Sequence, residues 1–521
     1  MSWQPEVDEI NRRRAWAEQM GGPTAVQRQH EGGRLTIRER IRDLVDPDSF
    51  REIGKLTGNA TYDKDGRINS IVPAPYVMGV AEIDGRPVAV GGEDFTVRGG
   101  TSWGGMRRKG GQGGFIEDLA FDYKIPLVNL IDGAGGTVTS TRRRGYSTFP
   151  GVDGFERSVE LLGQVPVASA VLGTAAGGPA GRAILSHFTV MPRGTAQVFA
   201  AGPPVVKRSL GQSITKEDLG GSPIAVDAAG TIHNAAADEA DAFRQVRRFL
   251  SFMPRNVWEL PPIAAATDPV ERREEDLLSI VPRRRTQPYN MRRVIEMVVD
   301  RESGFEIQPT FGKAVFTVLA RLAGHPVGII ANNPMHYGGA MDAKAARKQI
   351  HFMELCDCFH IPIVFLVDVP GFMVGLNAEE SGTLREGMRA VYIAGQLKVP
   401  TLTMVLRKCY GMAGMATCNK NGVDFKLAWP SGEWGSLPVE GGVAAAFRRE
   451  IEAAADPKQR ESELEQELRQ LASPLRTAEA FAVEDVIDPR ETRPVLCQFV
   501  RLAQGRLATD LGPRARAGVQ P

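Results

Sequence analysis

Apolar runs of strand length alternate with amphipathic segments of helical period along much of the chain. From Phe115 the order is FIEDLAFDYK, IPLVNLID, GFERSVELLGQ, VPVASAVLG and PAGRAILSHFTV. Continuous runs rich in Val, Ile and Leu predict strands buried in a parallel sheet, and their alternation with helices is typical of βαβ units. The pattern therefore predicts an α/β fold.

The segment from Val399 to Ala416, VPTLTMVLRKCYGMAGMA, is the most informative of these patterns. It begins as an apolar run around Pro400, breaks at small residues from Gly411, and continues in a way compatible with a helix start. A strand that turns on glycine into a helix leaves backbone N–H groups unpaired at the positive end of the helix dipole. Such a turn can hold an oxyanion, although glycines that merely let the chain bend would give the same pattern.

The same plan occurs twice in the chain. VPVASAVLGTAAGGPAG from Val165 repeats the arrangement that starts at Val399, at an offset of 234 residues. Two earlier pairs of segments match at offsets of 236 and 239 residues: IPLVNLIDGAGG with IPIVFLVDVPGF, and GRPVAVGGEDFTVRGG with GHPVGIIANNPMHYGG. Three ordered matches at a nearly constant offset predict two copies of one α/β unit, each about the size of a domain.

Two further segments frame these copies. GRLTIRERIRDLVDPDSF, near the N-terminus, predicts an amphipathic helix that Thr36 caps and that ends near Pro47. Residues 257–290 are rich in proline and charge, which is typical of a linker. We therefore expect two domains, residues 1–280 and 281–521.

The composition is that of an ordinary globular protein. With 521 residues, 42% of them hydrophobic, the chain can bury large cores. A net charge of +1 indicates no global field for nucleic acid or a membrane surface, so any anion site is local. No apolar run approaches the roughly 18 residues of a membrane span, and the first residues lack the apolar core of a signal peptide. Five scattered cysteines suit a reducing compartment, so we expect a cytoplasmic protein without disulfides.

Two clusters of side chains could carry chemistry. Arg142, Arg143 and Arg144 follow a predicted strand, where a parallel sheet binds ligands, so they form either a phosphate clamp for a long anionic cofactor or a solvated surface run. The sequence CDCFH, from Cys356, suggests a metal site. Residues two apart on a helix point about 200° from each other, however, so these thiols cannot converge and we expect no metal.

Several longer motifs carry a resemblance to a known family. They are LTIRERIRDLVDPDSF, EDFTVRGGTS, TAAGGPAG, FAAGPPVVK, EDLGGSPI, RRFLSFMP, VDVPGFMVG, RKCYGMAGM, LAWPSGEWG and DPRETR. From about Leu35 to Leu502 the chain resembles the carboxyltransferase (β) subunits of biotin-dependent acyl-CoA carboxylases, such as those for propionyl-CoA and methylcrotonyl-CoA. The resemblance implies two tandem crotonase-like domains and a homohexamer whose active sites lie between the first domain of one subunit and the second domain of another.

The resemblance also implies the reaction. Carboxybiotin releases CO2, its ureido nitrogen takes a proton from the α-carbon of an acyl-CoA thioester, and the resulting enolate attacks CO2. Two oxyanions develop, which two preorganised backbone holes would stabilise. By position, the resemblance assigns the thioester oxygen to Gly177 and Gly178, and the biotin oxygen to Met412 and Ala413.

The chain departs from the family pattern at places that bear on the substrate. The resemblance implies coenzyme A contacts near Gly135, Gly136 and the arginines Arg142 to Arg144, but the chain departs from the family there, with GAGGT where many members read SGGAR. Met415 stands where many members carry an Asp that faces the acyl pocket. A flexible thioether there predicts an acyl group bulkier than acetyl, unless Met415 is core packing behind the hole. No Met-Lys-Met sequence occurs, so we expect the biotin on a separate carrier, with a biotin carboxylase as partner.

Two other functions remain compatible with these motifs. An acyl-CoA decarboxylase would use the same two holes to stabilise the enolate that is left when CO2 departs. A binding or scaffold protein could keep the fold without activity, although retention of both glycine turns argues against this.

Overall fold

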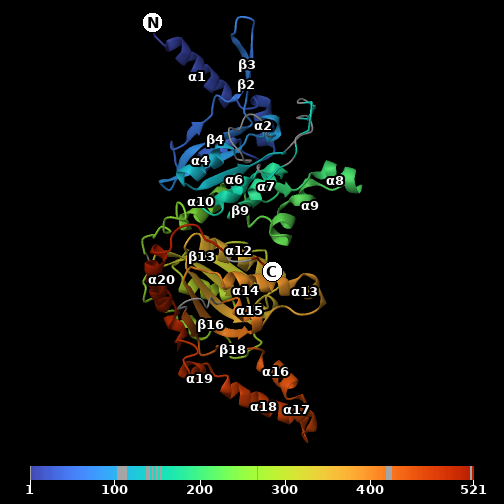
Figure 1. Cartoon of the computed structure of the whole chain (residues 1–521), viewed down its shortest axis with the longest axis vertical. Helices are drawn as coiled ribbons and strands as arrows, with labels where there is room; N and C mark the ends of the chain where they lie inside the picture. Colours follow the sequence, from blue (N-terminus) through green and yellow to red (C-terminus); the bar gives the residue numbers. More distant parts are fainter. Residues whose placement is uncertain are drawn as a thin grey trace. The chain divides into compact units, whose positions relative to one another are not determined.

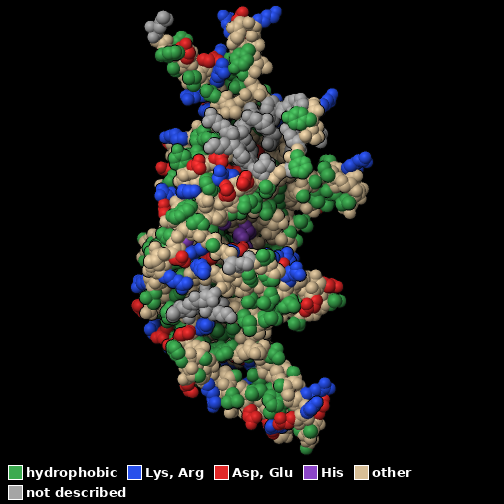
Figure 2. All heavy atoms as spheres, in the orientation of Figure 1, with side chains coloured by type: hydrophobic (Ala, Val, Ile, Leu, Met, Phe, Trp, Pro, Cys, Tyr) green, Lys and Arg blue, Asp and Glu red, His purple; other side chains and the backbone are tan. Residues whose placement is uncertain are grey.

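The computed structural model describes residues 2–101, 114–135, 141–142, 145–147, 149, 151–152, 155–266, 268–417, 425–516 and 519–521. The chain divides into two compact units, Met1–Glu259 and Leu260–Pro521, drawn from blue to green and from green to red in Figure 1. Each unit is built on its own large sheet. On the face shown in Figure 2, acidic and basic side chains are interspersed over both units.

The first unit contains a seven-stranded sheet in the order β1-β4-β5-β6-β7-β9-β11. The β1–β4 and β4–β5 pairs are antiparallel and the following pairs are parallel. The strands are β1 (Arg51–Ile53), β4 (Tyr76–Ile83), β5 (Arg86–Glu93), β6 (Leu127–Ile131), β7 (Val167–Val171), β9 (Phe188–Pro192) and β11 (Asn234–Ala236). Two small sheets add β2 (Gly58–Tyr62) with β3 (Ile68–Pro73), and β8 (Thr174–Ala176) with β10 (Gln197–Phe199).

Helices surround this sheet, and β6 and β7 are buried along their whole length. The helices are α1 (Gln4–Glu18), α2 (Pro23–Glu31), α3 (Ile37–Leu44), α4 (Phe115–Tyr123), α6 (Glu156–Leu161), α7 (Gly178–Ile184), α8 (Pro203–Leu210), α9 (Lys216–Gly220) and α10 (Glu239–Phe252), with the short helical turns η1 (Arg98–Gly100) and η3 (Pro223–Ala228). The expected cap of α3 is confirmed, because Thr36 accepts the Glu39 N–H and the Glu39 side chain bonds back to Thr36.

The second unit repeats the order of the first sheet as β12-β13-β14-β15-β16-β17-β19, with β18 beside β16. The β12–β13 and β13–β14 pairs are again antiparallel and the others parallel. The strands are β12 (Phe305–Glu306), β13 (Val315–Leu322), β14 (His325–Asn332), β15 (Ile363–Val369), β16 (Thr401–Tyr410), β17 (Phe425–Ala428), β18 (Glu433–Gly435) and β19 (Asp485–Val486). The predicted duplication of an α/β unit is therefore present in the fold.

Helices α16, α17 and α18 of the second unit project away from its sheet (Figure 1). The described helices of this unit are α11 (Met291–Val298), α12 (Ala343–Cys358), α13 (Leu376–Glu380), α14 (Thr383–Ala394), α15 (Gly411–Met415), α16 (Val439–Ala446), α17 (Arg448–Ala453), α18 (Pro457–Leu471), α19 (Pro474–Glu479) and α20 (Thr492–Ala508), with the short turns η4 (Glu275–Leu278), η5 (Tyr337–Gly339) and η6 (Pro489–Glu491). The segment expected to be a linker packs here, because Leu277 is buried in the core of this unit.

A two-residue turn joins the long antiparallel strands in each unit. The central residues are Asp84 and Gly85 between β4 and β5, and Ala323 and Gly324 between β13 and β14. All four have φ between 50° and 82°, the left-handed conformation of a type I′ hairpin turn. Glycine at the second position adopts this conformation without strain.

Candidate active-site turns

The first candidate turn lies where β8 meets α7. Gly177 precedes the helix with φ 60° and ψ −124°, a conformation that favours glycine, and Gly178 is the first helical residue. Pro179 follows at a position where its missing N–H costs nothing. Gly177 is exposed and Gly178 half-buried, and in the described part of the chain the Gly178 N–H has no acceptor. The turn can therefore donate to an oxyanion outside the protein backbone.

Gly135 lies directly against this turn. A Cβ atom at Gly135 would come within 2.5 Å of the Ala176 carbonyl oxygen, and a Cβ at Gly177 would lie 3.9 Å from the Gly135 Cα. The structure thus brings together Gly135 and Gly177, which the sequence analysis assigned to different parts of the substrate. Arg142 is exposed. The other predicted contacts, Gly136, Arg143 and Arg144, lie outside the described residues.

A buried ion pair anchors α7 beneath the first turn. Arg182, on α7, pairs with Glu93 at the end of β5, and both side chains are only 1% exposed. Burial acts to lower the pKa of Arg182, but the neighbouring Glu93 carboxylate raises it above its ordinary value, so the guanidinium stays charged. Glu93 also accepts the Asp132 N–H at 3.4 Å, which links the end of β6 to the helix.

Asp132 is itself the centre of a second buried network. It accepts from Arg40 and from Gln29, each at 3.0 Å, and Arg40 pairs in addition with Glu239. Because Asp132 immediately precedes Gly133, Ala134 and Gly135, this network fixes the backbone that packs against the Gly177 turn.

The second candidate turn lies between β16 and α15. Gly411 has φ 60°, the same value as Gly177, and the next residue, Met412, is 43% exposed while Ala413 is fully buried. By its φ, Gly411 corresponds to Gly177. The predicted pair in the first turn begins at this glycine, whereas the predicted pair in the second turn, Met412 and Ala413, begins one residue after it. The Met412 N–H belongs to the first turn of α15, where backbone N–H groups have no intrahelical partner.

A buried aspartate also supports this turn. Asp368, in β15, accepts from Arg407 Nε at 3.0 Å and from the Lys408 backbone N–H at 3.2 Å, and its carboxylate also pairs with Arg407 Nη2 at 2.8 Å. Tyr289 lies beside Asp368, and burial together with this carboxylate holds the pKa of its hydroxyl well above the ordinary value. Burial likewise lowers the pKa of the Lys408 ammonium, despite the nearby Asp368. The backbone of β16 at Lys408, three residues before Gly411, is therefore firmly held.

Asp132 and Asp368 were missed as supporting residues in the sequence analysis. The signal was present, because both aspartates end matching apolar runs, IPLVNLID and IPIVFLVD. An ionisable residue that closes a buried strand in both copies needs buried partners.

Two other predicted residues can now be placed. The Met415 side chain is 60% exposed, so it is not part of the core of the second unit. Cys356 is buried and Cys358 half-buried at the end of α12, and burial raises the pKa of the Cys358 thiol to about 12, which makes it a poor nucleophile or ligand. Among the described residues no helix is long and apolar enough to cross a membrane.

Comparison with known proteins finds a family model and relatives that match nearly the whole chain. Residues 28–516 match the model of the carboxyl transferase domain. The chain is 35% identical over 510 residues to the carboxyltransferase subunit of propionyl-CoA carboxylase from Haloferax mediterranei, covering 97% of both chains. It is 32% identical over 496 residues to methylmalonyl-CoA decarboxylase subunit alpha from Veillonella parvula, covering 95% of this chain and 94% of the relative.

A solved structure shares the whole architecture. The chain superposes on transcarboxylase 12S, a hexamer solved with methylmalonyl-coenzyme A bound, with a TM-score of 0.89 and 32% identity, covering 100% of this chain and 99% of that one. This likeness confirms the expected fold of two crotonase-like α/β domains.

Proposed function

Because this chain belongs to the carboxyl transferase family, we propose that it is the carboxyltransferase component of a biotin-dependent acyl-CoA carboxylase, with its chemistry carried by the Gly177–Gly178 and Met412–Ala413 turns. The observation that supports these roles most directly is the shared φ of 60° at Gly177, which precedes α7, and at Gly411, which begins α15. Two such turns match a reaction in which two oxyanions develop.

The first turn would hold the thioester oxygen of the acyl-CoA. As the α-carbon loses its proton, negative charge moves to this oxygen, and fixed N–H donors stabilise the charge without reorganising. The Glu93–Arg182 pair would keep α7 and its N–H groups in place during this change. Gly135 has no Cβ atom, so its backbone packs directly against the Ala176–Gly177 turn and would help to hold the donors in position.

The second turn would hold the ureido oxygen of biotin on a separate carrier, which supplies the carboxyl group. Two observations support biotin binding at this turn: Met412, at the start of α15, is accessible, and Gly411 has no side chain to obstruct a ligand. No side-chain base is needed, because the proton of the substrate has its acceptor on the other reactant. The role of this chain is to bind, orient and stabilise charge.

The direct test is carboxyl transfer between a carboxybiotinylated carrier and a panel of acyl-CoA thioesters, with the purified protein. We expect carboxylation of propionyl-CoA or bulkier acyl-CoAs in preference to acetyl-CoA. No transfer to any acyl-CoA, from a carrier that supports a known carboxyltransferase, would contradict the proposal.

The second candidate function is that of an acyl-CoA decarboxylase, which the similarity to the decarboxylase subunit from Veillonella supports. The same turns would stabilise the enolate that remains when CO2 leaves methylmalonyl-CoA. Transfer of the carboxyl group from labelled methylmalonyl-CoA to free biotinylated carrier, faster than the reverse transfer, would identify this direction.

We further propose a homohexamer in the cytoplasm that works with a biotin carboxylase and a biotin carrier subunit. The likeness to hexameric transcarboxylase 12S supports the assembly. Light scattering should give about six times the chain mass of 56.6 kDa. A monomer that is active at the same dilution would contradict it.

A further inference from the structure

A cavity of about 340 Å³ lies in the second unit, at the carboxyl edge of its parallel strands. Residues at or just beyond the ends of three strands line it: Arg407 of β16, Trp429 after β17 and Pro489 after β19. Segment 277–285 supplies another wall. Ligands of parallel sheets bind at this edge. The four residues proposed to form the turns, Gly177, Gly178, Met412 and Ala413, do not line the cavity, although Arg407 also takes part in the Asp368 contact behind the second turn.

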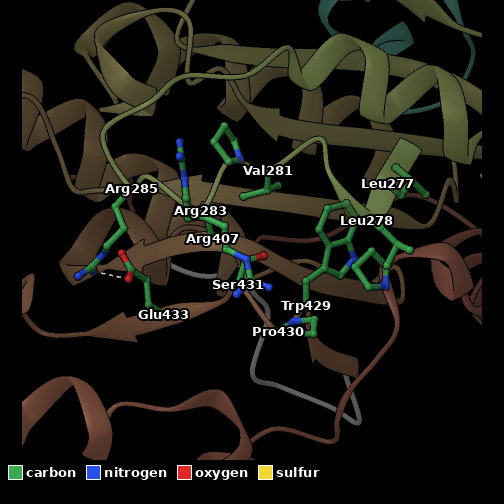
Figure 3. Close-up of a pocket in the computed structure, with 12 residues that line it drawn as sticks. Leu277, Leu278, Val281, Arg283, Arg285, Arg407, Trp429, Pro430, Ser431 and Glu433 are labelled. Atoms are coloured by element: carbon green, nitrogen blue, oxygen red, sulfur yellow. Dashed lines mark ion pairs between the residues drawn. The ribbon is translucent and has the colours of Figure 1, made fainter. Parts of the chain in front are cut away.

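The cavity has an apolar side and a cationic side (Figure 3). Leu277, Leu278 and Trp429 lie on the right of this view, and Arg283, Arg285 and Arg407 lie toward the left. A site with an apolar wall and a few charged groups at one end fits a ligand that has an apolar body and one charged end.

The carboxylates nearby balance only part of the cationic charge. Arg285 forms an ion pair with Glu433, and Arg407 pairs with Asp368. Arg283 is exposed, and no carboxylate of the described residues pairs with it. The cavity therefore carries one unbalanced positive charge, which suits a single negative charge on the ligand.

Arg407 can contribute hydrogen bonds as well as charge. Its guanidinium has five N–H donors: Nε donates to Asp368, Nη1 donates to the Gln287 carbonyl at 2.8 Å, and Nη2 forms the ion pair with Asp368. One N–H remains on each Nη atom. The side chain is 3% exposed and lines the cavity, and its two partners hold the group in place.

We propose that this cavity binds a small organic acid with one carboxylate and a compact apolar body. The carboxylate would meet Arg283 and the remaining N–H groups of Arg407, and the apolar body would lie against Leu278, Val281 and Trp429. A phosphate group fits less well, because Glu433 lies in the same wall and only one cation is unbalanced. The volume is near the lower end of known ligand sites, which limits the ligand to a few carbons beyond the carboxylate.

The test compares two probes of equal shape on the full-length protein. Hexanoate and hexanamide are titrated by saturation-transfer NMR, because they differ only in the charge of one end. We expect saturable binding of hexanoate and at least about tenfold weaker binding of hexanamide. No saturable binding of hexanoate up to about 20 mM, or equal binding of both probes, would overturn the proposal.

Variants separate this cavity from any acyl site that also accepts hexanoate. Arg283→Gln should weaken hexanoate binding about tenfold, whereas Arg284→Gln should leave it within about twofold, because Arg284 bonds to Thr286 and does not line the cavity. Val281→Phe, which fills the apolar side, should also reduce binding. All three variants should retain carboxyl transfer. Equal affinity for hexanoate in the Arg283 and Arg284 variants would assign the binding to another site.

Discussion

Asp300 holds the main hairpin of the second unit in the way that Asp46 holds the main hairpin of the first. Each carboxylate accepts both N–H groups of the two-residue turn. The distances are 3.1 and 2.8 Å in each unit, from Asp84 and Gly85 to Asp46 and from Ala323 and Gly324 to Asp300. The carboxylate thus satisfies the two backbone N–H groups of the turn, which would otherwise need water. Because Asp46 follows α3 and Asp300 follows α11, the same contact ties each turn to a helix.

An arginine completes this contact in both units, but its burial differs. Arg247 lies 2.9 Å from Asp46 with its side chain 30% exposed, whereas Arg493 lies 2.7 Å from Asp300 and is 1% exposed. If Asp46 is lost, water can solvate the Arg247 guanidinium. If Asp300 is lost, the charge of Arg493 remains buried.

We therefore predict that Asp300→Asn destabilises the protein more than Asp46→Asn. Removing one partner of a buried pair costs about 3 to 5 kcal/mol, and the more exposed pair should cost about 1 kcal/mol. Chemical denaturation of the two variants, followed by far-UV circular dichroism, measures the difference. Equal losses would mean that Arg493 finds compensation from Asp268 or from the backbone carbonyls around it.

Gly178→Val should abolish turnover while the fold persists. A branched side chain would crowd the position of the thioester oxygen and shift the turn, and loss of one oxyanion donor costs about 2.7 to 4 kcal/mol of barrier. The measurement is kcat of carboxyl transfer, with circular dichroism as the check of folding. Gly441→Val is the matched control, since a Cβ atom there meets no other atom within 4 Å. Near-normal kcat in a folded Gly178→Val protein would remove the oxyanion role from this turn.

Met415→Asp should shift the substrate preference toward short acyl-CoAs. An exposed thioether can line an apolar pocket, and a carboxylate in its place would be desolvated by any longer acyl chain. Each methylene should change kcat/KM by a factor equivalent to about 1 kcal/mol or more. The test compares kcat/KM for acetyl-, propionyl-, butyryl- and branched acyl-CoA. Leu475→Asp, at an equally exposed leucine, serves as control, and unchanged ratios in the Met415 variant would exclude the pocket.

Lys348→Met should stabilise the protein at neutral pH. The Lys348 side chain is 1% exposed and its ammonium lies 3.9 Å from Glu306, and burial lowers its pKa to about 8. Unfolding restores the ordinary pKa of about 10.4, so the unfolded chain holds more protons between these values and the unfolding free energy of the wild type rises with pH there. The variant should gain about 3 kcal/mol near pH 7 and progressively less toward pH 10.

Denaturation midpoints at several pH values, with Lys344→Met as an exposed control, test this prediction. A gain that does not shrink between about pH 8 and pH 10 would show that Lys348 stays charged throughout.

The duplicated fold could be predicted because the matching strands keep a nearly constant offset. The offset of the hairpins is 239 residues, from Gly85 to Gly324, but that of the supporting aspartates is 254 residues, from Asp46 to Asp300. The first unit carries the extra β2–β3 hairpin between these points, which changes the spacing. The equivalence of Asp46 and Asp300 was therefore hidden from a search for regular offsets.

The supporting ion pairs could not be predicted because their partners are far apart in the sequence. Glu93 and Arg182 are separated by 89 residues, and Asp368 and Arg407 by 39. Charge in a sequence usually indicates exposure, and only the fold, which brings the end of β5 to α7 and pairs β15 with β16, shows that these groups are buried. The glycine turns were predictable because their conformation depends on local residues.

Gly411 adopts the φ of Gly177 although different side chains follow it, Met412 in one unit and Gly178 in the other. In the proposed function the donors at these turns belong to the main chain, so replacing neighbouring side chains would leave the number of donors unchanged. Mutation at positions such as 412 and 415 would then alter which molecule fits, while the proposed charge-stabilising groups persist. Such an arrangement lets substrate range diversify among descendants without each step requiring a new catalytic group.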